Sequence, residues 1–154
     1  MREWLYLAVL LDAYSRRCIG WALGRRLTEA LTVEALEMAL ASRPTPSGLV
    51  HHSDRGVQYA SRDYTGRLHE AQIAISMSRK GNPYDNASAE SFLKTLKYEE
   101  VYLSEYRDEA DLRASLAYFV EEYYNQQRLH SALGYVPPVE FEAQLGGVTG
   151  VVFP

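Results

Sequence analysis

The feature that most constrains the fold of this chain is an apolar stretch near its start, residues 4–12. Its apolar side chains fill both sets of alternating positions, with Leu5, Leu7, Val9 and Leu11 in one set and Tyr6, Ala8 and Leu10 in the other. Because successive side chains of a strand point to opposite faces of a sheet, a strand of this kind is covered on both sides. The stretch therefore predicts a sheet with helices on each face.

The rest of the chain predicts strands and helices in alternation. After a turn at residues 12–15, we expect a returning strand at 17–24, a helix capped by Thr32, a strand at 49–52, a helix capped by Ser61, a strand at 73–77, a helix containing Glu90 and a long helix from about Asp108 to Gln126. This order is typical of an α/β domain. We assign residues 1–145 to it and expect residues 146–154, which show no periodicity, to form a loosely held tail.

Composition and charge limit the classes of function. No apolar run approaches the length of a membrane span, and the single Cys18 excludes an internal disulfide and suits a reducing cytoplasm. The net charge of −4 argues against a nucleic-acid-binding protein, which is typically basic. The acidity is uneven, however: residues 1–98 carry 13 basic and 10 acidic side chains, and residues 99–154 carry 3 basic and 10 acidic ones. Contacts with a phosphate backbone are therefore expected from the first part.

Two acidic residues, Asp54 and Glu90, are the candidate catalytic and metal-binding residues. Asp54 follows the short apolar run at residues 48–50 and precedes Arg55 and Gly56, so we place it where a strand gives way to a turn. Glu90 lies in the first turn of a predicted helix, and 35 residues separate the two acids. A strand end and a helix are rigid enough to hold two carboxylates against one metal ion. Taken alone, this pair is weak evidence, because most exposed acids are merely solvated.

Basic residues near Glu90 are candidate DNA contacts. Glu90, Lys94 and Lys97 share one stripe of the predicted helix, beside an apolar stripe of Ala89, Phe92, Leu93 and Leu96. Two interpretations are open: a surface ion pair between Glu90 and Lys94, or two lysines that hold DNA phosphates, which we favour. Arg79 and Lys80 extend the basic surface or are simply solvated.

Three other candidate residues, His51, His52 and Asp12, are interpreted as structural. His51 and His52 are adjacent, so they point to opposite faces of a strand and cannot both line one site; His52 remains a possible partner of a metal ligand. Asp12 follows the first strand directly, and its expected role is to accept hydrogen bonds from turn backbone groups.

Several sequence blocks resemble the transposases of bacterial insertion sequences, which belong to the retroviral-integrase superfamily. These blocks, in chain order, are LYLAVLLDAYSRRCIGWAL (residues 5–23), HSDRG (52–56), NPYDNASAESF (82–92), the LK pairs that follow and YYNQQRLHSALGYVPP (123–138). The resemblance implies a ribonuclease-H-like mixed sheet flanked by helices, with a site of two Asp and one Glu. Asp54 and Glu90 match the last two of these acids at the family's spacing, and Asp12 does not match a catalytic position.

The resemblance also implies that the first strand of the fold is central and carries the first Asp. This chain begins where the second strand should begin, so we infer that the first strand and its acid are absent. We expect either a gap in the sheet or direct pairing of the strand at 5–11 with the strand at 49–52, and weak stability in both cases.

The implied function is cleavage of DNA ends and their transfer to target DNA, with Mg²⁺ or Mn²⁺ as cofactor. The implied partners are the DNA of the element ends and of the target, and further copies of the chain assembled on that DNA. Because one acid is missing, we expect impaired or absent catalysis. The alternative is a catalytically dead remnant that binds DNA or protomers and interferes with full-length transposase. The block at 123–138 either packs the long helix against the sheet or contacts DNA through Arg128.

Overall fold

The computed structural model describes residues 4–53, 57–77, 87–145 and 151–153. Its strands are β1 (Tyr6–Asp12), β2 (Cys18–Gly24), β3 (Val50–Ser53), β4 (Ala74–Met77) and β5 (Val151–Phe153). Its α-helices are α1 (Glu29–Ser42), α2 (Arg62–Glu70), α3 (Ala87–Glu99), α4 (Glu109–Tyr118) and α5 (Pro138–Leu145). Short 3₁₀ turns lie at Val57–Tyr59, Val101–Leu103 and Ser131–Leu133, and none of the described helices is long and apolar enough to cross a bilayer.

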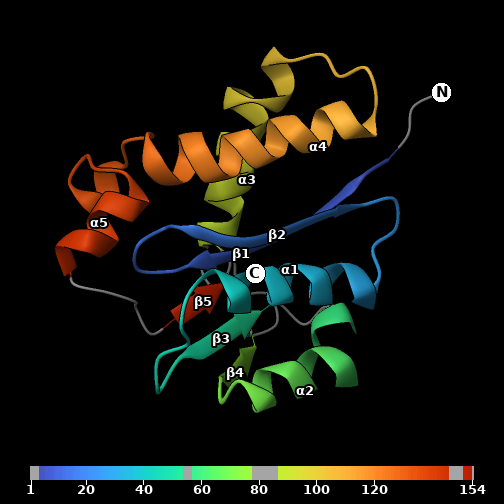
Figure 1. Ribbon diagram of the computed structural model, residues 1–154, viewed down its shortest axis with the longest axis vertical. Helices are drawn as coiled ribbons and strands as arrows, with labels where there is room; N and C mark the ends of the chain where they lie inside the picture. Colours follow the sequence, from blue (N-terminus) through green and yellow to red (C-terminus); the bar gives the residue numbers. More distant parts are fainter. Residues whose placement is uncertain (1–3, 54–56, 78–86, 146–150, 154) are drawn as a thin grey trace.

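The five strands form one mixed sheet in the order β2-β1-β5-β3-β4. β1 and β2 form the predicted antiparallel hairpin, and β3 and β4 pair in parallel. β5 lies between these two pairs, antiparallel to β1 and parallel to β3 (Figure 1). The expectation of a gap, or of direct pairing between β1 and β3, is therefore wrong. Residues 151–153, which lie in the segment expected to be a loosely held tail, supply the strand between β1 and β3.

Helices cover both faces of this sheet, as the two-sided pattern of β1 predicts (Figure 1). On one face, Ala8 and Leu10 of β1 pack with α1 and α2, and Tyr64 and Leu68 of α2 are almost fully buried there. On the other face, Val9 and Leu11 pack with residues of α3 and α4, including Phe92, Leu96 and Leu116. The fold is the expected α/β class.

Helix α1 lies against β2 more closely than a side chain on Gly20 would allow. A Cβ at Gly20 would collide with the backbone carbonyl of Ala35 and crowd the Ala39 side chain. The glycine therefore sets the spacing between helix and sheet, because the two backbones meet where the side chain would stand.

Most predicted helix starts are confirmed, and one is wrong. The Ser61 and Asp108 side chains accept hydrogen bonds from the backbone N–H groups of residues 64 and 111, as N-caps do. Helix α1 begins four residues earlier than expected, because Thr28 is its cap. Thr32 is buried inside the helix, and its hydroxyl donates to the Glu29 carbonyl at 2.9 Å instead.

The long helix predicted from Asp108 to Gln126 is present but not uniform. α4 continues into a wider π-helical segment, Phe119–Tyr124, before the chain turns away. The predicted packing stripe is confirmed: Leu116, Phe119 and Val120 are buried, and Leu112 and Tyr123 pack against them.

Candidate functional site

Helix α3 presents Glu90 to solvent on a rigid support. Phe92 and Leu96 are buried against the sheet, and Ala89 and Leu93 are partly buried beside them, as the periodicity predicts. Glu90, Lys94 and Lys97 are exposed on a neighbouring stripe of the helix. The structure describes both Glu90 and Lys94 and contains no ion pair between them, so the interpretation as a surface ion pair is not supported.

The second candidate acid, Asp54, lies outside the described residues, as do Arg79 and Lys80. The described residues that precede them in the chain are the carboxyl ends of two strands. β3 ends at Ser53 and β4 ends at Met77, and these two residues are paired in a parallel register. The chain therefore leaves both strands at the same end of the sheet, where their carboxyl ends lie. Among the side chains that the structure describes, no three His, Cys, Asp or Glu residues group as metal ligands do. Convergence of Asp54 and Glu90 remains a prediction.

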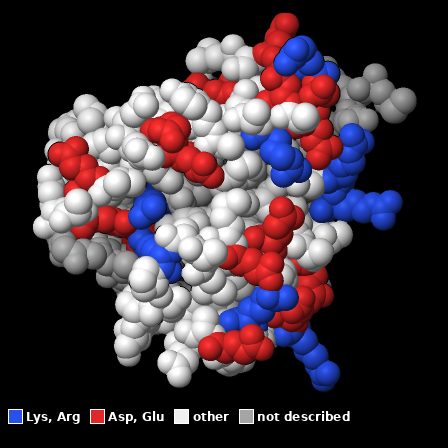
Figure 2. Space-filling model, in the orientation of Figure 1, with Lys and Arg blue, Asp and Glu red and all other residues white. Residues whose placement is uncertain are grey.

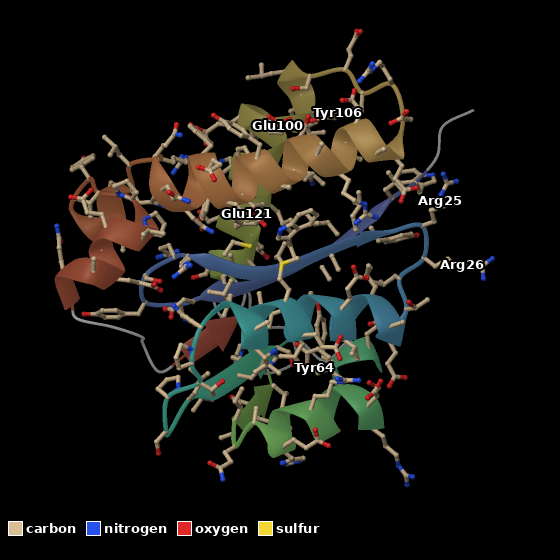
Figure 3. All side chains as sticks on the ribbon, viewed as in Figure 1. Arg25, Arg26, Tyr64, Glu100, Tyr106 and Glu121 are labelled. Carbon is tan, nitrogen blue, oxygen red and sulfur yellow. The ribbon has the colours of Figure 1, made fainter. Side chains whose placement is uncertain are left out.

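The two histidines of β3 point to opposite faces, as expected. His51 is 1% exposed, and its Nε2 lies 2.7 Å from the hydroxyl of Tyr64, a side chain that points inward from α2 (Figure 3). Burial lowers the pKa of His51 to about 4, so the ring is neutral at pH 7. His52 is half-buried, with Nδ1 at 3.2 Å from the Ser76 hydroxyl on β4. His51 has a structural role, and the suggested role of His52 beside a metal ligand remains a prediction.

Asp12 bonds turn backbone groups, as expected, and belongs to a buried charged cluster that sequence reasoning missed. Its Oδ1 accepts from the Tyr14 and Ser15 N–H groups at 2.9 and 3.0 Å. Its Oδ2 pairs with the Arg43 guanidinium, which also pairs with Glu142 of α5. No local pattern indicates this cluster, because its members come from three distant segments. It fastens α5 to the β1–β2 turn and to the end of α1.

The segment after α4 packs against the sheet, which is one of the two roles expected for it. The Asn125 side chain accepts from the Cys18 N–H and donates to the Cys18 carbonyl, both at 2.9 Å, so it continues the edge of β2 like another strand. This pair confirms that the segment packs against the sheet. Arg128 pairs through Nε with Glu99 of α3 at 2.7 Å and is partly exposed. Its contact with DNA remains a prediction.

The charged side chains are not separated into single-sign fields on the face shown in Figure 2. Acidic and basic side chains are interspersed there. Arg26, in the loop between β2 and α1, extends away from the molecule without a described partner (Figure 3). On this face a basic site is therefore a local arrangement.

The mixed sheet with helices on both faces is the fold of integrase catalytic cores. The solved catalytic core domain of HTLV-2 integrase in complex with magnesium, in its trimeric form, superimposes with a TM-score of 0.63 over 88% of this chain and 82% of that one, at 15% identity. At this identity the likeness shows the fold alone, and it confirms the ribonuclease-H-like prediction.

Sequence comparison supplies the family. Two models described as "Integrase core domain" match residues 1–83 and 71–138, so the chain belongs to the integrase core domain family. It is 44% identical over 138 residues to the insertion element IS600 uncharacterized 31 kDa protein of Shigella sonnei, covering 90% of this chain and 51% of that protein. It is 43% identical over 141 residues to transposase InsF for insertion sequence IS3fB of Escherichia coli, covering 92% and 49%. The chain spans about half the length of these relatives.

Proposed function

We propose that this chain is the catalytic-core part of an insertion-sequence transposase that cleaves DNA ends and transfers them to target DNA. The observation that carries the proposal is Glu90, an exposed carboxylate without an ion pair among the described residues, with Lys94 and Lys97 beside it on α3, in a chain of the integrase core domain family. Similar proteins named as transposases support the same assignment. In this proposal Lys94, Lys97, Arg79, Lys80 and Arg128 hold DNA phosphates.

We propose that Asp54 and Glu90 together hold Mg²⁺ or Mn²⁺. Carboxylate oxygens are the donors these ions prefer, and the exposed Glu90 has no competing ion pair among the described residues, so the donor set fits. When bound, the metal activates the attacking oxygen and neutralises charge on the leaving one. The lysines beside Glu90 orient the scissile phosphate, and copies of the chain assemble on the DNA. A similar solved core is described as trimeric and in complex with magnesium.

The activity of the isolated chain is expected to be weak or absent, because Asp54 and Glu90 match only two of the three acids that the family resemblance implies. The second candidate function is a binding one, interference with full-length transposase. The observation that favours it is β5, which completes the sheet from within this chain and so allows a folded unit that competes for DNA or protomers.

Metal binding tests the proposal without depending on turnover. Mn²⁺ binding, followed by electron paramagnetic resonance, should weaken by about tenfold or more in Asp54→Asn and in Glu90→Gln, since even outer-shell partners of a metal are worth about 10–100-fold. Glu122→Gln, an exposed acid of the π-helical segment, is the matched control and should bind Mn²⁺ like the wild type. Equal affinity in all four proteins would overturn the proposed site.

Nicking and strand transfer of labelled duplex DNA then separate the two functions. Residual Mn²⁺-dependent nicking that disappears in Glu90→Gln supports the catalytic core. DNA binding with no nicking, together with inhibition of a full-length relative, supports the interfering role.

A further inference from the structure

A basic pocket opens on α3 beside the stripe that carries Glu90. It has a volume of about 240 Å³ and is lined by residues from three segments: Arg16 of the β1–β2 turn, Ser91 and Thr95 of α3, and Tyr124, Arg128, His130, Ser131 and Ala132 after α4. None of these lining residues is acidic. Two guanidinium groups, an imidazole and several hydroxyls thus meet in one concave site.

The two arginines are held in place by neighbours that leave donors available. Arg16 has a left-handed backbone, with φ of 64°, and its N–H donates to the Asp12 carbonyl at 2.8 Å, so the turn fixes where its side chain starts. Its Nη1 donates to the Ser88 hydroxyl at 3.2 Å. Arg128 uses Nε for Glu99, which also accepts from the Tyr123 hydroxyl at 2.8 Å. The Arg128 side chain also bonds the Tyr123 hydroxyl and is partly exposed, so some of its five N–H donors remain for a further group.

His130 supplies an independent sign that the pocket takes a ligand. The residue is 8% exposed, and its Nε2 is buried without a hydrogen-bond partner in the described part of the chain. Its ring packs edge-on against Tyr124, with centroids 4.8 Å apart, and its carbonyl accepts from the Leu133 and Tyr135 N–H groups at 3.0 and 2.9 Å. A rigid, buried polar atom without a partner requires an explanation.

The position of the pocket relates it to the proposed site. Ser88, Ser91 and Thr95 recur at helical spacing and form a stripe next to that of Glu90, Lys94 and Lys97. A group bound among the hydroxyls would therefore lie one stripe away from the Glu90 carboxylate. Arginine forks match the oxygens of a phosphate group, and hydroxyls and imidazole N–H groups complete such sites.

We infer that this pocket binds a backbone phosphate of the DNA strand and fixes the register of that strand relative to Glu90. The inference rests on the proposed function, because it takes DNA as the source of the phosphate. Arg16, Arg128 and His130 are positioning residues in it, not catalytic ones. His130 lines the pocket, so the signals of its ring report a group bound there.

The test compares the affinity of the chain for a short DNA duplex, by fluorescence anisotropy over a series of salt concentrations. Arg16→Gln and Arg128→Gln should each weaken binding by about tenfold and lower the slope of log affinity against log salt by about 1, as expected when one phosphate is no longer neutralised. Arg26→Gln removes the same charge from an exposed loop and should change neither. Ser91→Ala should weaken binding without altering net charge, which guards against a misfolded arginine variant.

The outcomes distinguish the pocket from the proposed function. If the duplex binds and Arg16→Gln, Arg128→Gln and Ser91→Ala all behave like Arg26→Gln, the inference fails together with the Arg128 contact, while the metal site and the lysine contacts of the proposed function stand. If the duplex does not bind, both fail. A titration with inorganic phosphate, followed by the NMR signals of the His130 ring, completes the comparison. Shifts at His130 with phosphate alone and no effect of the variants on DNA would assign the pocket to a free anion and overturn the inference.

Discussion

The effect of adding a side chain depends on the space at that position, and Gly20 and Gly66 form a matched pair for testing this. Gly20→Ala should lower stability by about 1–3 kcal/mol or more, because its Cβ meets the Ala35 carbonyl and the helix must move. Gly66 lies inside α2, with open space where a Cβ would stand, so Gly66→Ala should raise stability by about 0.5–1 kcal/mol. Urea denaturation measures both changes, and two effects of the same sign would contradict this account of helix spacing.

The buried cluster of Asp12, Arg43 and Glu142 gives a second test at the residue scale. Asp12→Asn should destabilise the fold by about 3–5 kcal/mol, because it leaves a buried guanidinium short of a charge partner. Asp63→Asn breaks an exposed pair with Arg67 on α2 and should cost less than about 1 kcal/mol. Thermal unfolding of both variants measures the contrast, and similar decreases in stability would show that Asp12 acts only through its turn hydrogen bonds.

His51 makes stability depend on pH in a predictable direction. Its folded pKa of about 4 lies below the unfolded value of 6.5, so the unfolded chain binds more protons between these values. The contribution of His51 is therefore complete above pH 6.5 and is lost as pH falls, by about 2 kcal/mol at pH 5. His51→Phe should flatten stability between pH 7.5 and 5, and His69→Gln, which removes an exposed histidine, is the matched control. Burial also lowers the pKa of His130, so part of the slope should remain.

At the scale of elements, the predictions that rest on residue spacing within one segment were confirmed. The two-sided stripe of β1, the cap at Ser61 and the two faces of α3 all follow from spacing along one segment. The start of α1 did not, because Thr28 and Thr32 are equally good caps in isolation and packing of Leu31 against the sheet decides between them. Neither the Arg43 cluster nor the Asn125 pair with Cys18 was predictable, since their partners are far apart in the sequence.

Strand β5 was not predicted either, because the strands that it pairs with are far from it in the sequence. Its contribution can be tested by substitution. It is three residues long and has no pattern of its own, so its conformation depends on the inner edges of β1 and β3. Val152 is paired with both neighbours, and Val152→Pro removes the N–H there and should destabilise the fold by about 1–3 kcal/mol. Chemical denaturation measures the change. Val152→Thr keeps the N–H and should have a smaller effect.

Removal of residues 146–154 extends the test of β5. The two inner edges would then expose unpaired backbone groups, so the truncated chain should unfold at a lower temperature and associate more readily than the full chain. Calorimetry and sedimentation velocity measure both properties. A truncated chain that stays monomeric with unchanged thermal stability would show that β5 contributes nothing to the sheet.

At the scale of the whole molecule, the net charge of −4 means that any binding to DNA depends on where the cations lie. The acidic residues are concentrated after residue 98, and Lys94 and Lys97 stand just before that boundary on the exposed side of α3. The double variant Lys94→Gln/Lys97→Gln should lower the salt slope of duplex binding by about 2, because each lysine neutralises one phosphate in the proposed complex. Arg26→Gln/Arg62→Gln changes the net charge equally, at two exposed positions away from α3, and should leave that slope nearly unchanged. Equal decreases in the two double variants would mean that DNA responds to the overall charge of the protein, and that the stripe beside Glu90 does not hold the strand.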